Sequence, residues 1–175
     1  MSMTETTRLT STLAGDASKT LQDAALLVLR CAAAAVFIAH GAADIFDAGI
    51  STNVDNYTGA GIPLPALSAP FAAIVQFFGG FALLLGLVTR PVAAGLVVVM
   101  GGALIWVHRG ESLVMGQDGS GSGYALAMGV IALAVLILGP GRLSADRFLA
   151  GWLSQRDGAA SRRDTTVRRD GSARA

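Results

Sequence analysis

The chain has 175 residues, of which 53% are hydrophobic and 14% charged, and its formal net charge is +1. Charged residues make up about 25% of an ordinary soluble domain, so this composition favours a membrane protein with one domain. The single cysteine, Cys31, excludes an intrachain disulfide, a CxxC redox pair and a cysteine zinc site. A mechanism based on a dithiol within this chain is therefore excluded.

Residues 1–20 are rich in Ser and Thr and have no apolar periodicity, so we expect a disordered N-terminal tail. The apolar run at 24–43 is long enough to span a hydrocarbon core of about 30 Å. A cleaved signal peptide is the minor alternative, because its apolar region would be only about 7–15 residues long and more apolar runs follow here. Ala35, Ala39 and Ala43 form a stripe of small residues, which predicts the close approach of another helix.

Two further apolar runs, at about 66–88 and 91–108, stand back to back and predict a tight transmembrane hairpin. They follow a polar loop in which Pro63 and Pro65 force extended backbone on their neighbours. We therefore expect the second helix to begin just after these prolines. A second polar loop leads to the last apolar run, at about 123–139, which completes four spans.

The chain changes character after the fourth span. Apolar residues between Ala145 and Leu153 follow the spacing of one helical face. This spacing predicts a short amphipathic helix in the membrane interface, with Trp152 as its anchor. Residues 154–175 are expected to form a disordered basic tail. The sequence therefore predicts an all-α fold, an integral membrane four-helix bundle over residues 21–153.

The distribution of basic residues predicts the orientation of the bundle. Arg90 and the eight arginines from Arg142 to Arg174 fall on the side of the two termini, whereas Arg109 falls on the other side. Because Lys and Arg concentrate in cytoplasmic loops, we expect both termini in the cytoplasm. The protein is then a multi-pass protein of the cell (plasma) membrane, with the lipid bilayer as its immediate partner and no nucleic-acid partner.

This orientation places several polar residues of the spans at one level. His40 and His108 end the first and third spans on the outer side, and Gln76 lies in the outer half of the second. Asp44 follows His40 by one helical turn, where we expect it to orient the imidazole. These four residues predict an outward-facing pocket for ligand binding or proton relay. Ordinary interfacial histidines are the alternative.

Arg30 lies just inside the start of the first span. We expect its long side chain to reach back to the near interface, and the alternative is a role as partner of a buried polar group. A metal site is disfavoured, because no HxH or HxxxH pair preorganises the two histidines.

Several motifs, in this order, resemble the DoxX family of small integral membrane proteins. LLVLRCAAAAVFIAHGAADIF resembles the family's opening helix, with an Arg, a run of small and apolar residues, and then His-Gly. GAGIPLPALSAPFAAIVQFFGGFALLLGLVTRPVAA resembles its second signature, with a Gly-x-Pro loop, a Gly-Gly helix and a threonine-arginine turn. The third helix, which ends in His108, and the closing Gly139–Asp146 stretch resemble the rest. The resemblance covers about residues 26–148.

The resemblance implies a bacterial or archaeal four-helix membrane protein in which Arg30, His40, Gln76 and His108 occupy the family's polar positions. Some members are similar to the small subunit of a thiosulfate:quinone oxidoreductase. Mycobacterial relatives are associated with a membrane complex that contains a superoxide dismutase and a thiosulfate sulfurtransferase. The family commonly has Glu where this chain has Gln76, and an amide cannot exchange a proton near neutral pH as a carboxyl with a raised pKa can.

Three functions are open at this point. The first choice is a membrane subunit of a redox-associated complex, an oxidoreductase subunit that binds a quinone or a small sulfur or thiol species. The second is a non-catalytic scaffold that recruits soluble redox enzymes to the membrane, and the third is a protein that binds small molecules or lipid. A homo-oligomer is compatible with each of them.

Overall fold

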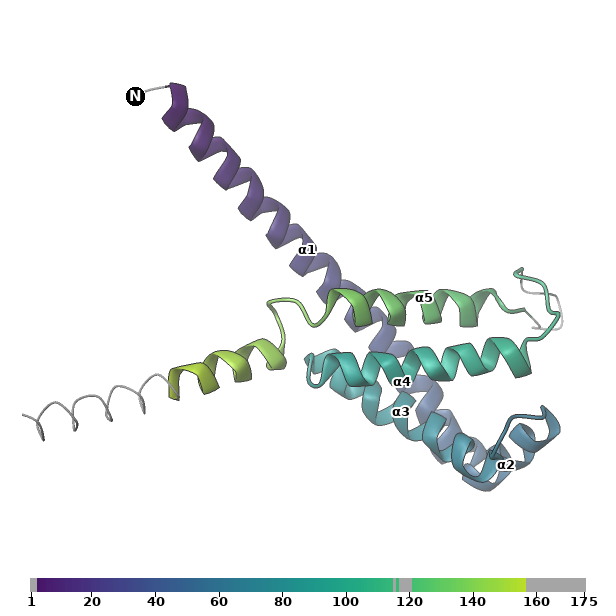
Figure 1. Cartoon of the computed structure of the whole chain (residues 1–175). Helices are drawn as coiled ribbons and strands as arrows, with labels where there is room; N and C mark the ends of the chain where they lie inside the picture. The colour runs from purple at the N-terminus through teal and green to yellow at the C-terminus, as the bar shows by residue number, and fades with distance from the viewer. Residues whose placement is uncertain (1–2, 115, 117–120, 157–175) are drawn as a thin grey trace, which may run out of the picture.

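The computed structural model describes residues 3–114, 116 and 121–156, with side chains from residue 18 onward. This part of the chain is helical and contains no strand. Four helices form a bundle, a short helix covers one end of it, and two π-helical segments extend α1 and α4 (Figure 1). The elements are α1 (Met3–Ala42), η1 (Ala43–Ala48), α2 (Ile50–Gly59), α3 (Pro65–Leu85), α4 (Thr89–Gly102), η2 (Ala103–Val107) and α5 (Gly123–Leu138).

Three segments of the described chain are long and apolar enough to cross a membrane: Ser18–Ala48, Pro65–Leu85 and Thr89–Val107. The fourth, α5, is equally apolar but has 16 residues. All backbone groups of a membrane-spanning segment need partners within the protein, and a helix supplies them locally. The prediction of an all-α membrane bundle is therefore confirmed.

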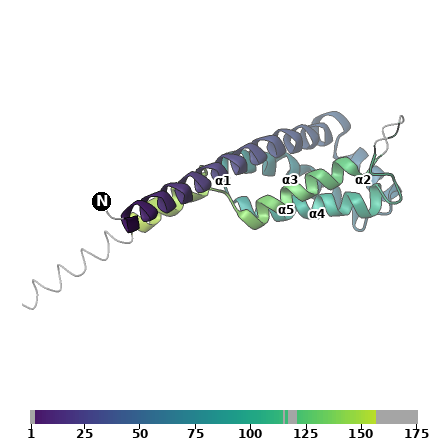
Figure 2. The ribbon, with the colours of Figure 1, turned by 90° about the horizontal axis from the view of Figure 1, so that it is seen from above.

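The first helix is longer than the sequence predicted. It begins at Met3, so residues 3–20, which were expected to be a disordered tail, continue α1 well beyond the bundle (Figure 2). This stretch contains no proline and one glycine, Gly15. Extending an existing helix through such residues is easy, because nucleation is the costly step.

The second span, α3, ends earlier than expected, and the third, α4, begins earlier. The second span was predicted to reach residue 88, but α3 ends at Leu85, because Gly86 and Val88 both adopt the left-handed conformation, with φ of 67° and 42°. Glycine adopts this conformation without steric cost. The chain then reverses, and α4 starts at Thr89.

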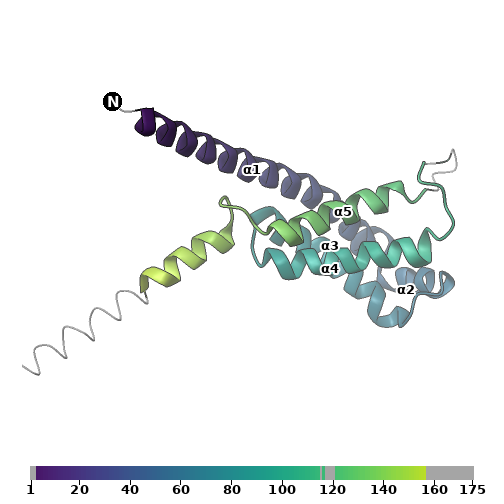
Figure 3. The same ribbon diagram turned by 45° about the horizontal axis from the view of Figure 1, so that its top comes forward.

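The bundle consists of two helix pairs, with α1 packed on α3 and α4 packed on α5 (Figure 3). Close approach between α1 and α3 depends on glycine: a Cβ at Gly80 would lie 2.6 Å from Cγ1 of Ile38, and one at Gly41 would clash with the backbone of Phe77. The predicted stripe of Ala35, Ala39 and Ala43 is not buried. The prediction therefore placed the close helix contact on the wrong face of α1, since the face with Gly41 packs against α3.

The predicted amphipathic helix is present and extends over residues 145–156, so it includes the first residues of the expected tail. Its large apolar side chains, Phe148 and Trp152 among them, are exposed. The guanidinium of Arg156 lies 4.3 Å from the centre of the Trp152 ring. The rest of the predicted basic tail, residues 157–175, lies outside the described residues.

The two ends of the bundle differ in the segments that they carry. The terminal end is where α3 ends, α4 begins and α5 ends, and the chain continues there into the helix at 145–156. The loop end carries η1, α2, η2 and the start of α5 (Figure 1).

Candidate functional site

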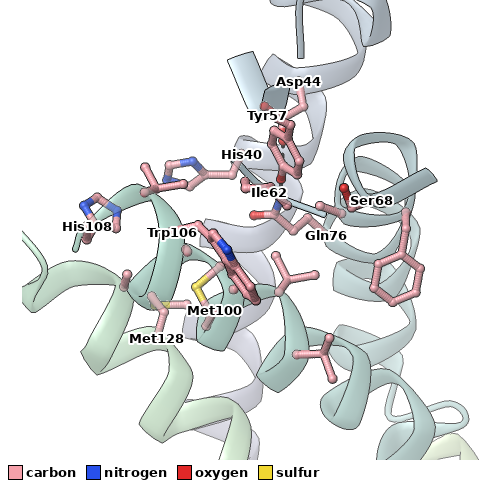
Figure 4. Close-up of a pocket in the computed structure, with 18 of the residues that line it drawn as sticks. His40, Asp44, Tyr57, Ile62, Ser68, Gln76, Met100, Trp106, His108 and Met128 are labelled. Carbon is pink, nitrogen blue, oxygen red and sulfur yellow. Dashed lines mark hydrogen bonds between the residues drawn. The ribbon is translucent and has the colours of Figure 1, made fainter. Parts of the chain in front are cut away.

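A cavity of about 480 Å³ opens at the loop end of the bundle. Helices α1 to α5 and both π-helical segments contribute to its lining, and His40, Asp44, Gln76 and His108 are among the lining residues (Figure 4). These residues meet because the helices are antiparallel: the end of α1 lies beside the beginning of α3, and the end of α4 lies beside the beginning of α5. The structure thus brings together four of the five residues that the sequence singled out.

The innermost polar contact of the cavity joins α3 to the end of α1. Gln76, which is buried, donates a hydrogen bond from Nε2 to Oδ2 of Asp44 over 3.3 Å. Asn53 of α2 donates from Nδ2 to the backbone oxygen of Asp44 over 2.9 Å. The Asp44 carboxylate therefore binds the amide of another helix, whereas the sequence predicted that it orients His40.

The π-helical segment η1 explains this difference. Asp44 lies within η1, which begins at Ala43. A π turn inserts one extra residue, so positions four apart no longer align on one face as they do in an α-helix. The prediction for His40 and Asp44 assumed a regular helix through this point.

The two histidines have different partners. The His40 ring lies 5.3 Å from the ring of Tyr124 on α5, tilted by 40°. His108 forms a 2.8 Å contact from Nδ1 to Oε2 of Glu111, and the same carboxylate oxygen accepts a hydrogen bond from the Gly121 backbone over 2.8 Å. Glu111 therefore contacts both His108, at the end of η2, and Gly121, just before α5, and so connects the two ends of the loop between these elements.

Several polar residues in or near the cavity were not selected from the sequence as members of the site. Glu111 follows His108 by three residues and could have been found by that spacing. Asn53 and Tyr124 carried no such signal, because the contacts with their partners depend on the path of the chain. Tyr57 of α2 also lines the cavity. Burial raises the pKa of its hydroxyl, and the nearby Asp44 raises it further, so Tyr57 stays protonated and can donate a hydrogen bond.

The remaining wall of the cavity is apolar and includes aromatic and sulfur-containing side chains (Figure 4). Phe37 is fully buried at its base, and Met100 and Met128 come from the facing helices α4 and α5. Trp106 of η2 contributes a flat indole surface. Such a combination of apolar walls and a few placed polar groups is typical of small-molecule sites of roughly 300–1,000 Å³.

Arg30, the fifth predicted site residue, lies at the terminal end and does not line this cavity. It is 1% exposed, so the expectation that it reaches back to the membrane interface is wrong. Its guanidinium donates to four backbone oxygens, those of Leu83 and Leu84 at the end of α3 and of Pro140 and Leu143 after α5. The Leu83 oxygen also accepts the Gly86 backbone N–H at the end of α3 over 3.1 Å, and the guanidinium supplies further donors at a helix end, where carbonyls lack helical partners. Arg30 therefore joins three segments.

Asp146 completes this structure at the terminal end. Its carboxylate accepts hydrogen bonds from the Val88 and Thr89 backbone nitrogens over 2.7 and 2.9 Å, and so caps the start of α4. Burial alone raises the pKa of Asp146, but these hydrogen bonds and the Arg30 charge outweigh it, so the pKa lies below its ordinary value. The predicted site and this cap lie at opposite ends of the bundle.

Within the described residues, no group of three or more His, Cys, Asp or Glu side chains lies close enough to hold a metal ion. The polar groups of the described lining residues are an amide–carboxylate pair, two imidazoles, two phenols, the Ser68 hydroxyl and the Trp106 indole N–H. These groups can donate and accept hydrogen bonds from a small ligand.

Four apolar helices around a cavity of this size define a multi-pass helical membrane protein with a cavity at one end. The sequence pattern of the DoxX family matches residues 25–109, which extend from the first span through η2. The chain belongs to the DoxX family. No curated protein and no solved structure matches it significantly.

Proposed function

We propose that this DoxX-family protein binds the ring of a quinone in its loop-end cavity, as a membrane subunit of a redox-associated system. The observation that carries the proposal is the cavity itself, in which an apolar, partly aromatic wall faces the Asp44–Gln76 pair. Under this proposal the chain's contribution is to bind and orient the ring.

A quinone ring is flat and has two carbonyl oxygens, so it needs apolar walls and hydrogen-bond donors at its ends. Trp106 and Phe37 supply wall, and Tyr57 supplies a donor. Gln76 uses one amide hydrogen for Asp44, which leaves the second for a ligand. His40 also lines the cavity (Figure 4).

The apolar tail of a quinone also needs an exit into the lipid. Phe71 of α3 and Val98 of α4 line the cavity and are also 46% and 65% exposed on the outside of the bundle. A ligand held between them has a path from the polar end of the cavity to the surface of the helices, where an isoprenoid chain would meet lipid.

A sulfur oxyanion such as thiosulfate fits the cavity less well. None of the described lining residues is Lys or Arg, and the Asp44 carboxylate would repel a dianion. Among the ligands that the sequence left open, the lining therefore favours the neutral quinone.

The test uses Trp106 as the reporter. The sequence has two tryptophans, so the full-length Trp152→Phe variant in detergent leaves Trp106 as the one source of indole fluorescence. Titration with a short-chain ubiquinone or menaquinone analogue is expected to give saturable quenching. In the same background, Gln76→Leu is expected to weaken binding roughly tenfold, since one ligand hydrogen bond contributes about 1.4 kcal/mol.

Asp47→Asn is the matched control, because this exposed carboxylate lies on the same π-helical segment as Asp44. It is expected to bind the quinone analogue as the parent does. Quenching that rises linearly without saturation, and equally in the Gln76→Leu variant, would show only partition into the micelle and would contradict the proposal.

The orientation of the bundle forms a second part of the proposal: both termini lie in the cytoplasm. Arg90, Arg142 and Arg147 lie at the terminal end and Arg109 follows η2 at the loop end, which supports it. Alkaline phosphatase fused after residue 175 is expected to be inactive, and fused after Arg109 to be active. The reverse pattern would contradict this orientation.

Recruitment of a soluble superoxide dismutase or thiosulfate sulfurtransferase stays a prediction, since residues 157–175 lie outside the described part of the chain. The test is to remove these residues and to compare the proteins that co-purify with the truncated chain and with the full chain. An unchanged set would contradict a scaffold role for this segment.

A further inference from the structure

A second cavity, of about 540 Å³, lies at the terminal end of the bundle, opposite the quinone site. It is bounded by α1, by the start of α4, by the turn after α5 and by the helix at 145–156. On α1 it begins at Gln22 and Asp23, the last polar residues before the apolar run. It therefore lies at the level where the apolar helix surfaces end, which corresponds to the headgroup region of a bilayer.

Three arginines surround this cavity: Arg90 at the start of α4, Arg142 after α5, and Arg147. The one carboxylate in the lining is Asp23, which faces Arg142 over 3.7 Å and also accepts the Arg142 backbone N–H over 2.9 Å. Three positive charges and one negative charge leave a formal charge of +2.

Arg90 and Arg147 supply the uncompensated charge. Both are exposed, and neither guanidinium has an ion-pair or hydrogen-bond partner among the described residues. Arg90 lies against Gly139, where an added Cβ would be 3.5 Å from its Nε. The Arg90 guanidinium therefore lies beside the end of α5, where it lines the cavity.

The wall on the membrane side of the cavity is apolar. It includes Leu26 and Leu29 of α1, Leu138 at the end of α5, and Pro140. Leu138 is 61% exposed, so the apolar wall continues onto the outer surface of the bundle. A ligand that fits this cavity has an anionic part near the arginines and an apolar part that continues along the helices.

We propose that this terminal-end cavity binds the phosphate of an anionic phospholipid headgroup, held by Arg90 and Arg147, with the acyl region along Leu26, Leu29 and Leu138. Guanidinium groups match the geometry of phosphate oxygens. The bilayer level and the apolar wall favour a lipid over free phosphate. The ligand would also join α1, α4 and the C-terminal helix at the place where Arg30 and Asp146 already connect the helix ends.

The test compares the full chain with the Arg90→Gln/Arg147→Gln double variant in a nonionic detergent. Added phosphatidylglycerol is expected to raise the melting temperature of the parent, because a ligand that binds the folded state stabilises it by mass action. The double variant is expected to need roughly 30-fold more phosphatidylglycerol for the same shift. Phosphatidylcholine, whose headgroup has no net charge, and inorganic phosphate are expected to produce little shift in either protein.

Arg156→Gln is the matched control, since Arg156 lies in the same C-terminal helix but stacks on Trp152. Its melting temperature is expected to rise with phosphatidylglycerol as that of the parent does. The Arg90→Lys/Arg147→Lys variant, which keeps both positive charges, is expected to show most of the parent's rise. A single cooperative melting transition without lipid shows that each variant folds.

An unchanged response in the double variant would overturn the proposal, and so would an equal loss in Arg156→Gln, which would indicate attraction to any basic surface. A shift of the same size with inorganic phosphate would overturn the assignment to lipid. The quinone titration does not involve these arginines, so the two proposals fail independently.

Discussion

Gln76 of α3 donates a hydrogen bond to the carboxylate of Asp44, at the π-helical end of α1. At this position an amide complements the carboxylate, whereas a second carboxylate would repel it. Gln76, at the position where the resemblance implies a Glu in other members, thus lets Asp44 remain the single acid of the pair.

An exchange of the two residues tests this pairing. Gln76→Glu alone is expected to destabilise the protein by about 2 kcal/mol near neutral pH, because it places two carboxylates side by side. Asp44→Asn/Gln76→Glu restores one donor and one acceptor and is expected to recover at least half of that loss. Melting temperatures in detergent give the coupling between the two positions.

Asp47→Asn serves as the control for the loss of a carboxylate that lies outside the cavity, and little change in melting temperature is expected. A double variant no more stable than Gln76→Glu would contradict the pairing.

A second prediction compares two glycines in the left-handed region. Gly86 lies in the turn between α3 and α4, and Gly110 follows η2. A Cβ at Gly86 would lie 2.7 Å from Nη2 of Arg30 and 2.6 Å from Cβ of Ser144, whereas one at Gly110 would meet nothing within 4 Å. Both residues have positive φ, 67° and 81°. Gly110→Ala is expected to cost about 1 kcal/mol of folding free energy from backbone strain alone.

Gly86→Ala is expected to cost about 3 kcal/mol or more, since it adds displacement of the buried Arg30 guanidinium to the same strain. Thermal or denaturant unfolding of the two variants in one detergent provides the measurement. Equal losses would mean that the contact between Gly86 and Arg30 does not constrain the turn.

The lowered pKa of Asp146 predicts how stability depends on pH. A carboxyl whose folded-state pKa lies below its unfolded value stabilises the protein above the unfolded value, about 3.9, and this contribution is lost as pH falls through the folded-state pKa. Asp146→Asn is therefore expected to be less stable than the parent at neutral pH, and the difference is expected to narrow below about pH 4.

Melting temperatures of both proteins from neutral pH to about pH 3 provide this comparison. Asp55→Asn, on the exposed surface of α2, is the control. Its melting temperature is expected to differ from that of the parent by nearly the same amount at every pH. A gap between Asp146→Asn and the parent that stays constant or widens in acid would contradict the capping role of Asp146.

The positions of His40, Gln76 and His108 near one end of the bundle could be predicted, because the lengths of the apolar runs fix where each antiparallel helix begins and ends. The partners of these residues could not. Tyr124 meets His40 across two helices that are far apart in the chain, and the contact of Asp44 with Gln76 depends on a π turn that apolar periodicity does not reveal.

The all-α membrane class of this protein follows from its sequence, because apolar length and the need to satisfy backbone groups act within each segment. The roles of the polar residues depend instead on how the helices pack. Arg30 looked like a residue at the membrane interface, but it is buried against backbone oxygens more than 100 residues away, those of Pro140 and Leu143. In a chain this apolar, a buried charge must find its partners inside the protein, and the packing of the helices selects them.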